Sequence, residues 1–353
     1  PEYREYERAM ATCMDSALKP YIKQYIDKGE KRVRELFENT PFLVMKSNGG
    51  VISARDSAEK PISTILSGPA AGALACSFLA ERCGFDRVIT FDAGGTSTDV
   101  TVVENGEVAR TTQTVIENFP IKVPMLDIVT VGTGGGSIAW VSPEGRLKVG
   151  PQSAGAFPGP MCYGRGGQEP TVTDAAMFLG HLPRTFLGGE VSLHLNQAQA
   201  GIRRLAEKLC LEPREAATGL LEIAAWNQAH GIRRMTIQRG RDPREYSLVA
   251  FGGAGPMMAG RISDILGMKS VIVPPSPGVG SAFGLQVVDL KNDYVRTVTQ
   301  REDQLNFQTI ESEFKKMQRE GVKDLKREGM TLKRTKYIRS MDLRYLGEAQ
   351  EME

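Results

Sequence analysis

Two carboxylates, two glycines and three hydroxyl side chains share eight consecutive positions of the chain, inside the segment FDAGGTSTDV at residues 91–100. Apolar, β-rich runs precede and follow this segment, which predicts a hairpin with a glycine tip. At such a tip, backbone N–H groups can approach an anion closely, because glycine has no Cβ. Asp92 and Asp99 would repel a bare phosphate, so we expect a divalent cation between them. Mg²⁺ fits, because it takes one or two carboxylates together with phosphate oxygens and water.

The alternative for residues 91–100 is a hairpin turn that only faces solvent. That alternative accounts for the glycines, which tight turns favour. It does not account for two aspartates and three hydroxyl residues at a single tip. The residues alone leave both interpretations open.

A second glycine-rich segment, FGGAGP at residues 251–256, follows an apolar run and leads into a predicted helix over 256–266. The N-terminus of a helix offers free N–H groups and the positive end of a dipole to an anion. Glycine there also lets a flat ring lie against the backbone. A purely structural turn explains the same residues, so both interpretations stay open.

Two common nucleotide-binding motifs are excluded by the sequence. The pattern G-x-x-x-x-G-K-[ST] of a P-loop does not occur. The segment GTGGGS at residues 132–137 is close to a dinucleotide fingerprint, but Ser137 stands where the last glycine belongs. The residues that follow predict a strand hairpin instead of a helix, so a Rossmann site is also excluded.

Small residues dominate two predicted helices, SGPAAGALA at 67–75 and PGVGSAFGL at 277–285. Ser67 is the predicted N-cap of the first. Gly72 and Ala73 in one helix, and Gly280 and Gly284 in the other, would allow two helix backbones to cross closely. Such a crossing could be a hinge between lobes or static packing, and the sequence does not decide between them.

The pattern of elements predicts an α/β protein. Strands and helices alternate after a β-meander that we expect over residues 87–112. Further helices are expected over 2–37, 196–209, 214–238 and 304–328. Pro20 lies inside the first of these and must either start a new helix or kink the old one. In the helix over 214–238, apolar residues at helical spacing predict a buried face formed by Leu220, Leu221, Ala224, Ile232 and Met235.

Composition narrows the class of protein. The chain has 353 residues, 41% of them hydrophobic and 24% charged, which suggests two domains of an ordinary globular protein. Its net charge of +2 gives no reason to expect nucleic acid or a membrane surface as a partner. No apolar run approaches the roughly 20 residues that would span a bilayer. The five cysteines are odd in number and form no C-x-x-C pair, which predicts reduced thiols in a cytoplasm.

In their order along the chain, DAGGTSTD, SGPAAGA, FGGAGP and GVGSAFG resemble motifs of the actin-like ATPase superfamily, which includes sugar kinases, actin and the chaperone ATPases. The resemblance implies an α/β, ribonuclease-H-like fold with one complete lobe and part of another. It implies that the hairpin is the second phosphate loop, at 91–100, and that 251–256 is the adenosine motif. The small-residue helices would connect the two lobes.

More narrowly, the chain resembles the hydantoinase A / 5-oxoprolinase family, which includes the β-subunit of acetone carboxylase. The blocks that carry this likeness are MKSNGG, GTGGGSIAWV, VGPQSAGAFPGPMCYGRGGQEPTVTDA, RGRDPREYSLVAFGGAGP and VPPSPGVGSAFGL. Members carry a further phosphate loop near their N-terminus, similar to D-x-G-G-T-x-x-D, and this chain holds one such motif. We therefore interpret it as a central piece of a larger subunit that binds ATP weakly alone. Its expected parts are 1–85 (end of lobe one), 86–290 (lobe two) and 291–353 (linker helix and start of the next domain).

The family resemblance implies an ATP-dependent hydrolase of cyclic amides such as hydantoin, 5-oxoproline or a related lactam. ATP would phosphorylate the substrate carbonyl, with a hydantoinase B-like subunit or domain as partner. The alternatives are an ATP-dependent ketone carboxylase subunit and a non-catalytic actin-like nucleotide-binding module. Neither a nucleic acid nor a membrane is expected as a partner, and a homo-oligomer is compatible with the sequence.

The resemblance also assigns expected roles to residues. Asp92 and Asp99 are the expected catalytic carboxylates, with Asp92 holding Mg²⁺ directly or through water and Asp99 orienting the hairpin or a water. The expected ATP-binding residues are Gly94, Gly95, Thr96 and Ser97 at the phosphates, and Gly252, Gly253 and Gly255 at the adenosine. Glu169 and Asp174 are candidates for a substrate or metal role. Their alternative is that they order a glycine-rich loop.

Five arginines lie close together at 233–244, in the segment RRMTIQRGRDPR. They are Arg233, Arg234, Arg239, Arg241 and Arg244. A contact with phosphate or with a partner subunit is one interpretation of this cluster. The favoured one is a solvated helix end with internal salt bridges.

Overall fold

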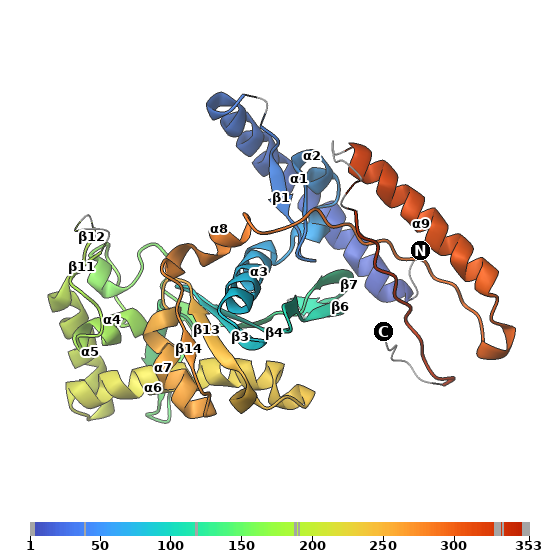
Figure 1. The fold of residues 1–353 in the computed structure, drawn as a ribbon. Coiled ribbons are helices and arrows are strands. Elements are labelled where there is room, and N and C mark those ends of the chain that lie inside the picture. The colour runs from blue at the N-terminus through green and yellow to red at the C-terminus, as the bar shows by residue number, and fades with distance from the viewer. Residues whose placement is uncertain are drawn as a thin grey trace.

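The computed structural model of the chain describes residues 4–38, 40–116, 119–186, 189, 191–327, 333 and 335–347. It is a mixed α/β structure around a six-stranded sheet with the order β14-β13-β3-β4-β5, in which β8 also pairs with β4 (Figure 1). The strands of this sheet are β3 Arg87–Ala93, β4 Thr98–Glu104, β5 Glu107–Val108, β8 Val129–Val131, β13 Ser247–Phe251 and β14 Val271–Ile272.

The sheet combines a meander with parallel strands. β3, β4 and β5 follow one another antiparallel, which confirms the meander predicted over 87–112 as far as residue 108. From Arg110 the chain enters β6, which pairs with β7 in a separate two-stranded sheet. β13 runs parallel to both β3 and β14. Asn105 and Gly106, at the β4–β5 turn, both have positive φ angles of 52° and 78°. Two residues of this conformation form the tight turn that matches the twist of a hairpin.

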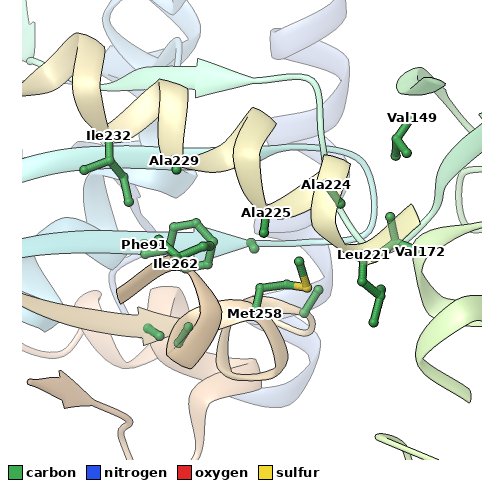
Figure 2. Close-up of a cluster of buried hydrophobic side chains, with 14 of the residues drawn as sticks. Phe91, Val149, Val172, Leu221, Ala224, Ala225, Ala229, Ile232, Met258 and Ile262 are labelled. Atoms are coloured by element: carbon green, nitrogen blue, oxygen red, sulfur yellow. The ribbon is translucent and has the colours of Figure 1, made fainter. Parts of the chain in front are cut away.

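Helices cover both faces of the sheet. On one face lies α3, Ser67–Arg82, and on the other lie α6, Pro213–Met235, and α7, Gly255–Leu266 (Figure 1). Side chains alternate between these faces along each strand. Val88 and Val249 pack with the α3 cluster, while Phe91 packs in the cluster that α6 and α7 share (Figure 2).

The α6 helix has the apolar face that its sequence pattern predicted. Leu220, Leu221, Ala224, Ile232 and Met235 are all buried. They belong to the larger hydrophobic core, where Figure 2 shows α6 above Phe91 and Ile262. Burial of a full helical stripe, rather than helix propensity, holds this element on the sheet.

The two small-residue segments cross closely, as expected. The second is shorter than predicted: α8 spans only Gly280–Gly284. The Phe251 side chain fills the space beside Gly72 and Gly280, where an added Cβ would lie 2.6 Å and 2.7 Å from its ring carbons. At Gly284 a Cβ would overlap the carbonyl oxygen of Ala71. This crossing requires glycine, because the two backbones are in direct contact.

The predicted N-cap of the helix at 67–75 is wrong, and one of the two alternatives for Pro20 is excluded. Ser67 is not the N-cap of α3, because Leu66 holds the cap position in a left-handed conformation and Ser67 is already helical. The first helix, α1 Glu5–Leu36, continues through Pro20, so no new helix starts there. Pro20 removes the N–H that would bond the carbonyl of residue 16. Both positions are exposed, so water can bond that carbonyl.

The remaining elements surround this core. The strands are β1 Leu43–Met45, β2 Val51–Ser53, β6 Arg110–Ile116, β7 Phe119–Leu126, β9 Ser137–Val141, β10 Leu147–Ser153, β11 Thr185–Phe186 and β12 Val191–Ser192. The helices are α2 Ala54–Glu59, α4 Val172–Phe178, α5 Leu195–Leu209 and α9 Phe307–Arg327, with short 3-10 helices at Pro61–Thr64, Met161–Tyr163, Ile237–Arg239, Pro243–Glu245, Pro277–Val279 and Glu302–Gln304. α1 and α9 lie on one side of the sheet, and α4 and α5 lie on the other (Figure 1). Across the described residues, every helix is too short or too polar to cross a membrane.

The α3–α8 crossing yields a stability prediction. Gly284→Ala should lower the free energy of unfolding by about 1–3 kcal/mol, the usual cost of forcing a methyl group into filled space. Gly260→Ala is the matched control, since Gly260 lies inside α7 with open space around it. There the change should raise stability by about 0.5–1 kcal/mol through helix propensity. Urea unfolding followed by circular dichroism measures both, and an unchanged midpoint for Gly284→Ala would contradict the crossing.

Candidate phosphate and metal site

The two glycine motifs meet at one edge of the sheet. Parallel strands end on the same side, and the register pairs Phe251 of β13 with Asp92 of β3. The chain then turns at Gly252, whose φ is +81°. A Cβ on Gly252 would overlap Oδ1 of Asp92, so only glycine fits against this carboxylate. The Ala254 N–H donates to the Ala93 carbonyl at 2.8 Å, which fixes the two turns to one another.

Asp92 and Asp99 face each other across the β3–β4 pair. They occupy directly opposed positions, so both side chains leave the same face of the sheet. Each carboxylate is half-buried and accepts one hydroxyl hydrogen bond. The Ser281 Oγ of α8 donates to Asp92 at 3.1 Å, and the Thr130 Oγ1 of β8 donates to Asp99 at 2.6 Å.

The electrostatics of this pair are unfavourable in the protein alone. Burial raises the pKa of Asp92 above its ordinary value, the Ser281 hydrogen bond opposes that rise, and the charge of Asp99 adds to it. Burial likewise raises the pKa of Asp99, and the Thr130 hydrogen bond opposes it. Two half-buried like charges without a cation are a costly arrangement.

The donor set fits a hard divalent cation. The two carboxylates and two hydroxyl groups offer only oxygen atoms, which suit Mg²⁺ or Ca²⁺ and not a soft metal. Within the described ranges, no group of three or more acidic, histidine or cysteine side chains gathers into a closed cage. A site with two carboxylates and open positions is the kind that Mg²⁺ completes with water and phosphate oxygens.

The hairpin tip next to these carboxylates presents free donors. The Gly94 N–H closes the turn on the Ser97 carbonyl at 3.0 Å. The N–H groups of Gly95 and Thr96 donate no hydrogen bond to any other residue that the structure describes. Both residues are exposed, while Ser97 is half-buried. The tip therefore has the exposed backbone donors that the phosphate interpretation requires.

The segment 132–137 packs directly against this hairpin tip. The Gly135 N–H donates to the Gly94 carbonyl at 2.9 Å, and the Gly136 N–H donates to the Gly95 carbonyl at 2.6 Å. A Cβ on Gly134 would lie 2.6 Å from the Gly94 oxygen. The predicted exclusion of a Rossmann helix is confirmed, because β9 and β10 form a hairpin after this segment. Sequence reasoning missed its contact with the hairpin; the available signal was three consecutive glycines after a strand.

Asp174 is buried and fully occupied by local hydrogen bonds. Its carboxylate accepts from the N–H groups of Met161, Cys162 and Thr171 at 3.1, 2.7 and 2.9 Å, and from the Thr171 hydroxyl at 2.8 Å. Together with Thr171 it forms the capping box of α4. The structure therefore favours the loop-ordering alternative for Asp174. Glu169 lies in the same loop and is exposed.

The 251–256 junction continues into α7. Gly253 is exposed with open space at its Cβ position, and Gly255 is buried at the first position of the helix. The start of α7 thus lies beside Asp92 and the hairpin. The positive end of its dipole adds positive potential at this edge.

The arginine cluster is engaged in internal contacts. Arg239 pairs with Asp127, Arg241 lies 3.5 Å from Glu104, and Arg244 lies 2.6 Å from Asp242. The guanidinium of Arg233 lies 5.2 Å from the ring centre of Trp226. Arg234 is exposed. These contacts support the interpretation of a helix end with internal salt bridges.

Comparison with known proteins identifies the family of this α/β chain. The hydantoinase/oxoprolinase family model matches residues 8–294. The chain belongs to this family.

Individual relatives extend over most of the chain. Caprolactamase subunit alpha of Pseudomonas jessenii is 36% identical over 356 residues, covering 99% of this chain and 51% of the relative. The crystal structure of the ATP-dependent caprolactamase from that organism superposes with a TM-score of 0.83, covering 99% of this chain and 52% of that one. The acetophenone carboxylase gamma subunit of Aromatoleum aromaticum is 39% identical over 296 residues, covering 82% of this chain and 40% of the relative. The chain thus spans about half the length of these proteins, or less.

The raised pKa of Asp92 predicts a pH-dependent effect on stability. The folded protein binds this proton more tightly than the unfolded chain does. The contribution of Asp92 to the free energy of unfolding therefore falls as pH rises from the unfolded pKa, about 3.9, through the higher folded pKa. Asp92→Asn should therefore be more stable than the unchanged protein at pH 7. The gain should shrink as pH falls below the folded pKa.

Urea unfolding at a series of pH values measures this gain without added metal. Asp264→Asn, an exposed carboxylate on α7, is the control and should show no comparable gain. A loss of stability in Asp92→Asn at pH 7 would contradict the unneutralised, half-buried carboxylate described above.

Proposed function

We propose that the natural full-length protein uses ATP and Mg²⁺ to activate the carbonyl group of a cyclic amide for ring opening. The observation that carries this proposal is the half-buried Asp92–Asp99 pair beside a hairpin tip with free N–H groups. The relatives support it, since the similar caprolactamase is named as ATP-dependent. A lactam or related cyclic amide is accordingly the substrate class we favour.

The proposed lobe is ribonuclease-H-like, as in actin-like ATPases. Its support is the sheet order, with an antiparallel meander extended by parallel β13 and β14. The close crossing of α3 and α8 is a second support, because small residues are what a connection between lobes requires. On this basis we propose 1–85, 86–290 and 291–353 as the end of lobe one, lobe two and the following linker.

Each residue at the edge has a proposed task. Asp92 holds Mg²⁺ directly or through water, and Asp99 orients the hairpin or a water. The free N–H groups of Gly95 and Thr96 bind phosphate oxygens, assisted by Gly94 and Ser97. The turn at Gly252, Gly253 and Gly255 borders the adenosine. When bound, Mg²⁺ would neutralise charge on the phosphates and on the two carboxylates.

The proposed reaction moves the γ-phosphoryl group of ATP to the carbonyl oxygen of the amide. The bond from phosphorus to the bridging oxygen breaks, and ADP leaves. Phosphorylation makes the carbon more electrophilic, so water adds there and the carbon–nitrogen bond breaks, with the ring nitrogen leaving as an amine. A second water releases phosphate and the open-chain acid. The protein's contribution is positioning and charge stabilisation by preorganised donors.

A ketone carboxylase subunit is the second candidate function. The acetophenone carboxylase gamma subunit is as similar in sequence as the caprolactamase subunit. Both proposals place the same phosphorylation at this site and differ in what attacks or leaves afterwards. Relatives of both kinds are named as subunits, which supports a partner subunit or domain of the hydantoinase B type.

The proposal predicts a catalytic effect of Asp92. In the full-length protein with its partner, Asp92→Asn should lower kcat of substrate-dependent ATP hydrolysis about 100-fold or more, because a charge-stabilising group is lost. Assays against hydantoin, 5-oxoproline, lactams and ketones supply the measurement. Asp242→Asn, in a surface pair with Arg244, is the control and should retain activity.

Retained substrate-dependent hydrolysis in Asp92→Asn would remove the catalytic assignment. ATP binding without hydrolysis, under every substrate of that panel, would favour the non-catalytic nucleotide-binding module instead.

The proposal also predicts weak binding by the 353-residue chain alone. If a second phosphate loop completes the site in the full-length protein, this chain should bind MgATP at least about tenfold more weakly, a difference of 1.4 kcal/mol or more. Isothermal titration calorimetry compares the two. Micromolar affinity in the short chain would mean that one lobe suffices.

A further inference from the structure

The 132–137 segment makes more contacts with the hairpin tip than its turn requires. Beside the two backbone hydrogen bonds from Gly135 and Gly136, the Thr98 hydroxyl donates to the Thr133 carbonyl at 2.6 Å. The carbonyls of Gly94 and Gly95 therefore both accept hydrogen bonds from the 132–137 segment. Those carbonyls belong to the peptide units whose N–H groups are the free donors of Gly95 and Thr96.

Two buried side chains fix this segment from the protein interior. Both the N–H and the hydroxyl of Thr173, in the first turn of α4, donate to the Gly135 carbonyl at 2.8 Å. Gln228 of α6 donates from Nε2 to the Thr98 hydroxyl at 2.9 Å. Its own Oε1 is buried without a partner in the described structure, so burial of this amide is offset only by the bonds that Nε2 makes.

These contacts form a continuous path from α4 to the hairpin tip. Asp174 belongs to the capping box of α4, and the adjacent Thr173 donates to the Gly135 carbonyl. The Gly135 N–H in turn donates to the Gly94 carbonyl. We propose that Thr173 is a positioning residue, which acts through the 132–137 segment to aim the N–H groups of Gly95 and Thr96 at the phosphates of ATP. The orientation of an anion-binding N–H group matters because a dipole that already points at the anion needs no reorganisation on binding.

This inference rests on the proposed function only for its ATP readout. The GQEPTVTDA segment then has a task that does not require Glu169 or Asp174 to touch substrate. Removing the Thr173 hydroxyl leaves its backbone N–H bond in place. The effect should therefore be a looser hairpin in a folded protein.

The test compares Thr173→Val, which removes the hydroxyl at constant size, with Thr173→Ser, which keeps it. The control is Thr236→Val, because the Thr236 hydroxyl is also buried and donates to a backbone carbonyl, that of Ile232 at 2.7 Å, at the far end of α6. All variants are studied in the full-length protein, at a temperature where circular dichroism shows them folded.

The first readout is amide hydrogen exchange and needs no nucleotide. In Thr173→Val, exchange at Gly135 and Gly136 should be about tenfold faster, since one hydrogen bond's net worth corresponds to such a factor. The second readout is ATP hydrolysis, where KM for ATP should rise by about the same factor while KM for the amide stays unchanged. Thr173→Ser should restore both, and Thr236→Val should alter neither.

The proposal is overturned if Thr173→Val matches the unchanged protein in exchange and in KM for ATP, or if Thr236→Val shifts both equally. If Thr173→Val does not fold, Thr173→Ala carries the same comparison, since it also removes the hydroxyl that donates to the Gly135 carbonyl. An unchanged protein that hydrolyses no ATP with any cyclic amide or ketone would contradict the proposed function instead. In that case the exchange readout still decides whether Thr173 positions the hairpin.

Discussion

The parallel pairing of β3 with β13 is the constraint on which the rest of the site depends. It brings the end of one strand, with Asp92, against the glycine turn that ends the other. Ligands of open α/β sheets bind beyond the carboxyl ends of parallel strands, because the chain leaves room there. In this protein the hairpin tip, the start of α7 and Ser281 of α8 all lie beside Asp92 at this edge. Moving β3 by one residue would turn Asp92 to the opposite face of the sheet.

The same edge carries an electrostatic cost that the fold alone does not offset. Two carboxylates share one face with partial burial, and among the described residues each accepts a single hydroxyl hydrogen bond. A cation and a phosphate would remove that cost together, because the metal neutralises the carboxylates while the free N–H groups donate hydrogen bonds to the anion. Stability sacrificed at a ligand site is a common feature of functional sites. This coupling is why we propose that the edge binds ATP and Mg²⁺ together.

The sequence predicted the parts of this site that local patterns encode. The residue types at 91–100, the turn at 251–256 and the amphipathic face of α6 were all visible in short windows. The contact between 132–137 and Gly94 was not, because it depends on the pairing of β8 with β4, between residues about thirty positions apart. Nor did the sequence show that Asp174 accepts four hydrogen bonds, since two of the donors, the N–H groups of Met161 and Cys162, lie on a segment whose path is set by tertiary packing. Of the two alternatives for Pro20, the start of a new helix is excluded, because the carbonyl of the exposed residue 16 needs no N–H partner from the helix.

The central claim is that the hairpin tip and Asp92 together hold the phosphates and metal of ATP. The most direct measurement is a structure of the full-length protein with Mg²⁺ and a non-hydrolysable ATP analogue. The account predicts phosphate oxygens within hydrogen-bond distance of the Gly95 and Thr96 N–H groups, and a magnesium ion bound to Asp92 directly or through one water. A nucleotide bound elsewhere, with this hairpin tip facing only solvent, would contradict it.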